Sequence, residues 1–180
     1  MEKYVALLRG INVGGNNKVE MSKLKACFES LGYTNVSTYI NSGNVIFVTE
    51  ATDVPTLVTT IEKAIHKAFS LEVRVVVRDA KNIHKICKAI PPEWENDVEQ
   101  KTDVLFLWDE YDNKKSINLI TTTPGVDILL YVPGAILWNV KRSDYRKSGM
   151  QKFIGSVVYK HMTARNVNTV RKLGILLEVL

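Results

Sequence analysis

In the first half of the chain, short apolar runs typical of strands alternate with stretches whose apolar residues recur at the spacing of a helix. Asn41-Ser42-Gly43-Asn44 separates two strand-like runs and is typical of a tight hairpin, and Gly32 supplies a stop after the first helical stretch. The predicted order is therefore strand, helix, strand, strand, helix, strand. The stretches, in that order, are 5–8, 21–31, 36–40, 45–48, 55–69 and 71–78.

This order is that of the split βαβ, or ferredoxin-like, arrangement. In that topology the first and second strands run parallel, and the third strand lies between them, antiparallel to both. The end of the first strand, the start of the first helix and the hairpin then lie at one edge of the sheet. We therefore expect Asn44, at the start of the third strand, to lie near Arg9, at the end of the first.

The second half repeats the pattern less clearly. Apolar residues at 83–90 predict a connecting helix that Pro91-Pro92 ends, and the acidic and polar segment 93–97 is interpreted as the domain boundary. Strand, weak helix, strand, strand and helix follow, over 104–108, 114–122, 126–132, 136–140 and 153–158. A last helix is predicted to begin near Thr163, in place of a last strand.

Residues 175–180 fit either the end of that helix or a short strand. Because the two halves share an order of elements, we predict an internal duplication at the level of the fold. The fold class is then α+β, with two ferredoxin-like halves. The first half, with its connecting helix, is 1–92, and the second, with its carboxy-terminal helix, is 93–180.

Composition fits a globular protein with a core, because 46% of the residues are hydrophobic and 24% are charged. The net charge of +5 is uneven: 141–180 holds nine Lys and Arg against two acidic residues, and the first 140 residues are slightly negative. A basic end of this kind attracts anionic partners, nucleic acid among them, but it is also typical of a solvated face.

Other protein classes find little support. Cys27 and Cys87 lie in helical apolar patterns and are interpreted as core residues, not a disulfide. The segment after Met1 does not resemble a signal peptide, and no apolar run approaches the roughly 20 residues that span a membrane. We therefore expect a cytoplasmic protein without a membrane partner. The three histidines lack ligand-like spacing, so no metal site is expected.

The strongest chemical signal is the polar loop after the first strand. Arg9, Asn12, Gly14, Gly15 and Lys18 combine side-chain and backbone donors just before a helix, which suits an anion. Their spacing fits neither a P-loop nor a dinucleotide-binding fingerprint. The alternative is an ordinary loop whose glycines supply unusual backbone angles and whose asparagines satisfy turns.

Two further segments contribute polar residues to the same candidate site. Ser42, Gly43 and Asn44 belong to the hairpin, and only the predicted convergence with Arg9 gives them a functional meaning. Thr163 suits a helix N-cap. Arg165, Asn166 and Thr169 would then lie on neighbouring turns and could present donors together, although an exposed helix surface is the commoner explanation.

Taken in order, these motifs resemble a bacterial family of uncharacterised proteins, the domain-of-unknown-function family numbered sixteen ninety-seven. The matching segments are Leu8-Arg9-Gly10-Ile11-Asn12-Val13-Gly14-Gly15, Met21, Leu24, Thr38-Tyr39, Ser42-Gly43-Asn44-Val45, Thr163-x-Arg165-Asn166-x-x-Thr169 and Lys172-Leu173. Asn41 stands where a glutamine is expected. The resemblance implies two ferredoxin-like halves with scope for exchanged terminal elements, and it supplies no activity. Its signature residues are Arg9, Asn12, Gly14, Ser42, Gly43, Asn44, Arg165, Asn166 and Thr169.

The preferred interpretation is a protein that binds a small phosphate- or carboxylate-bearing molecule, a nucleotide included. Arg9, Asn12, the Gly14-Gly15 amides, Lys18 and the Ser42–Asn44 hairpin would form the site, closed by Arg165, Asn166 and Thr169 from the second half. No carboxylate is expected nearby, and no group for proton transfer stands out. The sequence does not decide between enzyme and binding protein, and it identifies no cofactor and no oligomeric state.

Two alternatives remain open. A nucleic-acid-binding protein is less favoured, because Tyr4 and Phe47 are isolated and do not form the aromatic signature of RNA-binding sheets. The other alternative is structural: both polar segments lock the halves together through buried hydrogen bonds. That alternative predicts Arg165 buried against the first half and no open pocket beside Arg9.

Overall fold

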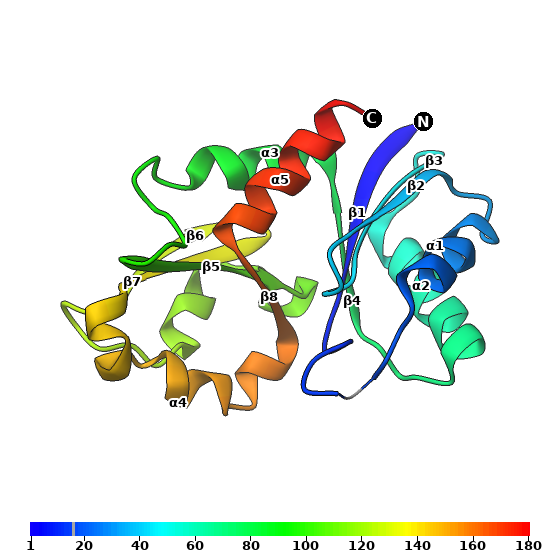
Figure 1. Ribbon diagram of the computed structural model, residues 1–180. Coiled ribbons are helices and arrows are strands. Elements are labelled where there is room, and N and C mark those ends of the chain that lie inside the picture. The colour runs from blue at the N-terminus through cyan, green and yellow to red at the C-terminus, as the bar shows by residue number, and fades with distance from the viewer. Residues whose placement is uncertain (16) are drawn as a thin grey trace. The chain divides into compact units, whose positions relative to one another are not determined.

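The computed structural model describes residues 1–15 and 17–180, so Asn16 of the polar loop lies outside the described residues (Figure 1). The chain divides into two compact units. The amino-terminal unit is Met1–Lys81 together with Ile175–Leu180, and the carboxy-terminal unit is Asn82–Gly174. None of the described helices is long and apolar enough to cross a membrane.

The amino-terminal unit has a four-stranded sheet in the order β2-β3-β1-β4, in which every neighbouring pair is antiparallel. β3 lies between β1 and β2, as the split βαβ arrangement requires. Its elements are β1 (Glu2–Leu8), α1 (Met21–Glu29), β2 (Thr34–Tyr39), β3 (Asn44–Thr49), α2 (Val54–Phe69) and β4 (Val75–Asp79).

The core of this unit forms where α1 and α2 cover one face of the sheet (Figure 1). Alternate β1 residues point toward the helices, and Leu57, Ile61 and Ile65 form a buried stripe along α2 at helical spacing. Asp53 caps α2 by accepting a hydrogen bond from the Thr56 N–H at 2.9 Å. The buried apolar faces of α1 and α2 therefore place both helices on the same side of the sheet.

The end of the last helix, α5 (Val167–Glu178), also belongs to the amino-terminal unit. Its segment Ile175–Leu180 groups with that unit, and the Lys3 Nζ donates to the Leu177 carbonyl at 2.9 Å. The first strand is thus held partly by the last residues of the chain.

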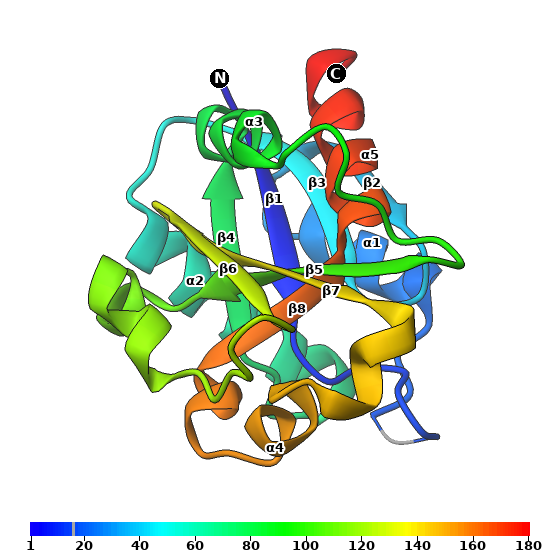
Figure 2. The ribbon, with the colours of Figure 1, turned by 90° about the vertical axis from the view of Figure 1, so that its left-hand side faces the viewer.

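The carboxy-terminal unit has a second antiparallel sheet, in the order β6-β7-β5-β8. Its strands are β5 (Gln100–Leu107), β6 (Ile128–Val132), β7 (Ala135–Lys141) and β8 (Met162–Asn166). Its α-helices are α3 (Ala80–Ala89), α4 (Met150–Ile154) and α5 (Val167–Glu178), of which α3 and α5 extend beyond the unit. Figure 2 shows α4 on one side of this sheet and α3 with α5 on the other.

The two sheets repeat one strand order, with β5, β6, β7 and β8 in the places of β1, β2, β3 and β4. Each last strand ends in an arginine and a short polar residue, Arg78-Asp79 in β4 and Arg165-Asn166 in β8, and a helix begins at the next residue. This repeat supports the predicted duplication at the level of the fold and confirms an α+β architecture in two halves.

The prediction of a helix beginning at Thr163 is wrong. Met162–Asn166 forms β8, which pairs with β5, and Thr163 is a strand residue. Met162 and Ala164 pack on the core of the unit, so their alternation is that of a strand. The cap of α5 is Asn166, whose Oδ1 accepts a hydrogen bond from the Thr169 N–H at 2.9 Å.

Several boundaries also differ from expectation. The weak helix at 114–122 is the 3₁₀ helix Lys114–Leu119, and the helix at 153–158 is divided between α4 and the 3₁₀ helix Val158–His161. The undecided segment 175–180 continues α5 as far as Glu178. The domain division at residues 92 and 93 stays a prediction about which segments fold independently.

Candidate functional site

The end of β1 and the β2–β3 turn meet at one edge of the amino-terminal sheet. Leu7 lies opposite Asn44 in the ladder, and the Leu8 N–H donates to the Gly43 carbonyl at 2.8 Å. Arg9 follows directly in the chain. The predicted convergence of the first strand end with the hairpin is therefore confirmed.

Asn12 links the two ends of the polar loop and also links the loop to the hairpin. The Asn12 Nδ2 donates to the carbonyls of Val19 at 2.9 Å and Asn41 at 3.0 Å, and its Oδ1 accepts from the Val19 N–H at 2.8 Å. The Asn17 Nδ2 donates to the Gly10 carbonyl at 3.0 Å. Asn12 adopts φ +54°, a left-handed conformation that asparagine tolerates better than most residues. Its side-chain amide thus has a clear structural role.

Two hairpin residues of the predicted site also have structural roles. Asn44 is fully buried, and its Nδ2 donates to the Tyr39 carbonyl at 2.9 Å and to the Ser42 Oγ at 3.1 Å. Gly43 has φ +76°, and a Cβ atom at this position would lie 2.7 Å from the Ile11 Cδ1. The Ser-Gly-Asn motif therefore closes the turn tightly against the polar loop.

An open hollow of about 560 Å³ lies beside the loop, at the start of α1. Three residues of the predicted site line it: Asn12, Gly15 and Lys18. The other lining residues are Val19, Glu20, Met21, Ser22 and Asn41. Arg9 is half-buried and is not among them, and its backbone N–H donates to the Arg74 carbonyl at 2.9 Å.

Glu20 brings a carboxylate into this hollow, contrary to the expectation that none lies nearby. Its carboxylate accepts a hydrogen bond from the Ser22 hydroxyl and lies 3.3 Å from the Lys23 Nζ. These two contacts, with the Ser22 hydroxyl first, hold the pKa of Glu20 below its ordinary value. Glu20 is also the residue before α1, and no side chain of the described residues caps that helix terminus.

Arg165, Asn166 and Thr169 lie in the carboxy-terminal unit and have local partners there. The buried Arg165 donates from Nη1 to the Thr163 Oγ1 at 3.0 Å and to the Ala164 carbonyl at 2.8 Å. Burial lowers the pKa of Arg165 to about 10, so the guanidinium remains charged at neutral pH. Because Arg165 lies on a strand, the predicted presentation of all three side chains from one helix is wrong.

Asp127 accepts hydrogen bonds from several segments of the carboxy-terminal unit, and no sequence pattern predicted this role. Its carboxylate accepts hydrogen bonds from the Thr123 and Gly149 N–H groups, the Trp138 Nε1 and the Ser148 hydroxyl. Burial raises the pKa of Asp127, but these hydrogen bonds, led by that of Ser148, outweigh burial and leave the pKa below its ordinary value. The donors come from separate segments, so no local motif marks this residue.

The described part of the chain contains no cluster of side chains suited to metal or thiol chemistry. There, no group of three or more His, Cys, Asp or Glu side chains could hold a metal ion. Cys27 and Cys87 are free thiols, and burial raises the pKa of Cys27. A raised pKa lowers the thiolate fraction at neutral pH and makes Cys27 a poor nucleophile.

Comparison with solved structures identifies a close structural relative. The conserved bacterial protein SP0830 from Streptococcus pneumoniae matches over 98% of both chains, with 28% sequence identity and a TM-score of 0.85. The acetolactate synthase small subunit from Thermotoga maritima aligns over 92% of this chain and 97% of its own, with 22% identity. Its TM-score is 0.25, which is too low to support an argument. No protein with a curated description matches the chain.

A family model described as "Protein of unknown function (DUF1697)" matches residues 1–136. The match spans the polar loop, the Ser42–Asn44 hairpin and the hollow between them, and it stops before β8. It covers well over half of the 180 residues. The chain therefore belongs to the DUF1697 family of proteins of unknown function.

Proposed function

We propose that the amino-terminal unit binds a small molecule through a phosphate or carboxylate group, in the hollow beside α1. The observation that carries the proposal is the exposed turn Gly14-Gly15 with Lys18. A Cβ atom at either glycine would meet nothing within 4 Å, so packing does not require glycine there. Positive φ values and missing side chains leave room for a ligand to approach the backbone.

The start of α1 adds favourable electrostatics. Its first backbone N–H groups receive no side-chain cap from the described residues, and a helix amino terminus carries partial positive charge. Met21 and Ser22, the first two residues of α1, line the same hollow as Lys18. An anion placed there would meet a formal positive charge and backbone donors together.

Glu20 opposes such a ligand and provides the sharpest test. Its carboxylate is already engaged by Ser22 and Lys23, but its negative charge still lies in the hollow. Glu20→Gln should therefore strengthen anion binding, and Lys18→Ala should weaken it, each by roughly three- to tenfold at low salt. Lys25→Ala is the matched control, because Lys25 pairs with Glu29 on α1 and is not among the lining residues.

The experiment is a titration with inorganic phosphate and with succinate, followed by the backbone amide signals of Gly14 and Gly15. Support requires saturable shifts of these two signals, weakened by Lys18→Ala and unchanged by Lys25→Ala. Equal loss in both lysine variants would mean non-specific attraction to a basic protein. If the amide signals of Gly14 and Gly15 do not shift, the proposal is refuted and the loop is a structural element only.

The remaining residues of the predicted site have a less direct part in this proposal. Asn12, Gly43 and Asn44 build the loop and hairpin that hold the hollow open. Participation of Arg165, Asn166 and Thr169 in ligand binding stays a prediction. We also propose a cytoplasmic location, where the free thiols of Cys27 and Cys87 would stay reduced.

Nucleic acid remains the less favoured ligand, because the basic stretch 141–180 is not matched by exposed aromatic residues on the amino-terminal sheet. Tyr4 and Phe47, the aromatic residues of β1 and β3, are buried and stack on each other at 5.7 Å in the core of the amino-terminal unit. They are therefore not available to stack on bases. Salt-dependent binding of single-stranded RNA at low ionic strength would reverse this ranking.

A further inference from the structure

A second hollow, of about 530 Å³, lies within the carboxy-terminal unit, between the loop that precedes β5 and the end of β7. Its volume is in the range of small-molecule sites. It shares no residue with the hollow beside α1. The lining residues are Glu93, Trp94, Val98, Glu99, Gln100, Asn139, Lys141 and Ser143.

A hydrogen-bond chain fixes the orientation of Asn139. The Thr102 hydroxyl donates its only hydrogen to the Glu95 carbonyl at 2.7 Å, so toward Asn139 it can only accept. The Asn139 Nδ2 donates to the Thr102 Oγ1 at 2.8 Å and to the Gln100 Oε1 at 2.9 Å. Both amide hydrogens are thus engaged. Among the described residues, none donates a hydrogen bond to the Asn139 Oδ1.

Trp94 provides the complementary group. Asn139 and Trp94 are each only 6% exposed, and the Trp94 Nε1 donates no hydrogen bond to any described residue. Neither atom is completely sealed from the surface. Both residues line the hollow and are more than nine-tenths buried, which leaves the Asn139 Oδ1 and the Trp94 Nε1 as the acceptor and the donor that an occupant could use. Buried polar groups are normally hydrogen-bonded, so this pair points to a polar occupant.

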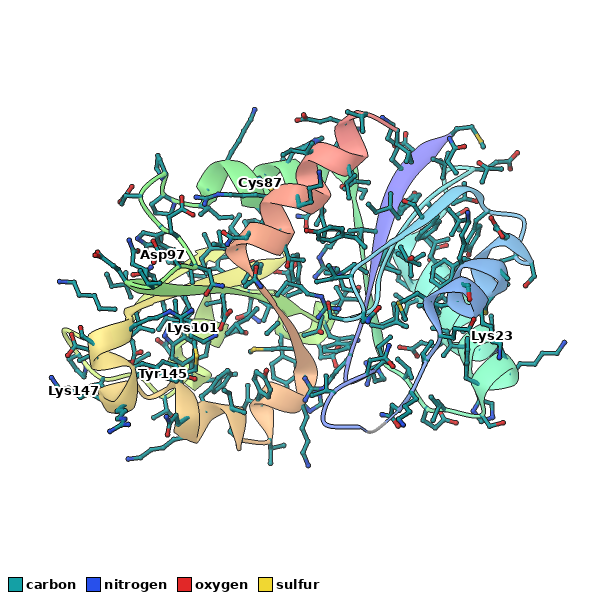
Figure 3. All side chains as sticks on the ribbon, in the orientation of Figure 1. Lys23, Cys87, Asp97, Lys101, Tyr145 and Lys147 are labelled. Carbon is teal, nitrogen blue, oxygen red and sulfur yellow. The ribbon has the colours of Figure 1, made fainter. Side chains whose placement is uncertain are left out.

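The walls of the hollow are preorganised. The Asp97 carboxylate accepts from the Glu99 and Gln100 N–H groups, both at 2.8 Å. These hydrogen bonds, chiefly that from the Gln100 N–H, hold the pKa of Asp97 below its ordinary value. The Trp94 carbonyl accepts from the Arg171 Nη2 at 2.9 Å. Figure 3 shows Asp97 on the loop beside the edge of the carboxy-terminal sheet. A loop held in this way reduces the entropy lost on binding.

The rim selects the class of ligand. Glu93 and Glu99 disfavour an anion, and Lys141 disfavours a cation. A hydroxyl group, in contrast, can donate to the carboxylates and accept from the ammonium or the indole N–H. Val98, which is largely exposed, adds apolar surface for the carbon skeleton of such a ligand.

We propose that this hollow, built around Trp94 and Asn139, binds a neutral, hydroxyl-rich molecule of the size of a sugar. The Trp94 Nε1 donates to one hydroxyl, the Asn139 Oδ1 accepts from another, and Glu93 and Glu99 accept from hydroxyls at the rim. This proposal is independent of the anion site in the amino-terminal unit.

The test uses the full chain labelled with ¹⁵N and a panel of probes: glucose, galactose, ribose and N-acetylglucosamine. The readout is the indole N–H signal of Trp94, identified by its absence in Trp94→Phe. At least one sugar should shift this signal saturably. The double variant Glu93→Ala/Glu99→Ala, which alters only exposed side chains, should weaken that binding about tenfold.

Glu110→Ala is the matched control, since it removes a carboxylate of the same unit that does not line the hollow. Its sugar binding should equal that of the unaltered protein. Inorganic phosphate and spermidine test the charged alternatives. The proposal is overturned if no sugar shifts the Trp94 signal, if a charged probe shifts it instead, or if the double variant binds as tightly as the control.

Discussion

Asn12 and Asn41 join two segments that are distant in sequence: the Asn12 Nδ2 donates to the Asn41 carbonyl at 3.0 Å. The same side chain also bonds both backbone groups of Val19. One amide thus fastens the polar loop to the hairpin and to the segment that leads into α1. Because Asn41 contributes only its backbone carbonyl, substitution of Asn12 should lower stability far more than substitution of Asn41.

Asn12→Gly should lower the free energy of unfolding by about 2 kcal/mol, because three hydrogen bonds are lost while glycine still adopts the positive φ. Asn12→Ala should cost about 1 kcal/mol more, since alanine is strained in that conformation. Asn41→Ala keeps the accepting carbonyl and should change stability by less than about 0.5 kcal/mol. Urea unfolding measures all three, and equal losses at Asn12 and Asn41 would contradict this assignment.

Gly43→Ala should destabilise the protein far more than Gly14→Ala. Both glycines have positive φ, which costs alanine about 1 kcal/mol. Only at Gly43 would the new Cβ collide with other atoms, the Ile11 Cδ1 at 2.7 Å and the Leu8 Cβ at 2.8 Å. We expect a loss of about 3 kcal/mol at Gly43, from strain and overpacking together.

Thermal unfolding of the two glycine variants gives the comparison. Ile11→Val removes the Cδ1 atom and should restore part of the stability of Gly43→Ala. Similar melting temperatures for Gly43→Ala and Gly14→Ala would show that the close approach at Gly43 is easily relieved.

Asn166→Ala should lower the free energy of unfolding by about 1 kcal/mol, because α5 loses its side-chain cap. Asn166→Asp retains an oxygen that can accept from the Thr169 N–H and should keep most of that stability. Guanidinium unfolding monitored by circular dichroism distinguishes the two. If both variants lose the same stability, Asn166 acts through another contact.

Asp127→Asn should cost about 2 kcal/mol at neutral pH, since an amide cannot replace a carboxylate that accepts four hydrogen bonds. The pKa of Asp127 is lowered in the folded state. Its stabilisation is therefore complete above the ordinary pKa of about 3.9 and is lost as the pH falls through the lower folded value.

The stability gap between the unaltered protein and Asp127→Asn should thus be widest near neutrality and should narrow in acid. Unfolding curves recorded at several pH values between neutrality and the acid transition measure it. Asp144→Asn, which alters a partly exposed carboxylate paired with Lys147, should give a smaller gap. A gap that does not depend on pH would mean that the charge of Asp127 contributes nothing.

Local patterns predicted the amino-terminal unit well. β1 and β3 contain short continuous apolar runs, and the Asn41–Asn44 turn fixes the hairpin, so the position of Asn44 near the end of β1 follows from chain direction. β8 was missed because the strand has only five residues and only two of them, Met162 and Ala164, are apolar. The pairing of Arg165 with Val104 that makes this segment a strand is also non-local.

The candidate site, like the fold, was predicted from the sequence only in part. The presence of donors in the polar loop could be read from composition, but the direction of each side chain could not. Asn12 and Asn44 are engaged internally, and Glu20 lies in the hollow although its sequence position marks it only as preceding a helix. Trp94 and Asn139 line one hollow from segments far apart in sequence, and no sequence motif marks them.

The grouping of Ile175–Leu180 with the amino-terminal unit imposes an order on assembly during translation. The ribosome completes β1 early, yet Lys3 acquires the Leu177 carbonyl only after all of Asn82–Gly174 has emerged. The contacts of Ile175–Leu180 with the amino-terminal unit therefore cannot form until the second unit has been synthesised. Final closure of the earliest-made part of the molecule is then a late, long-range event.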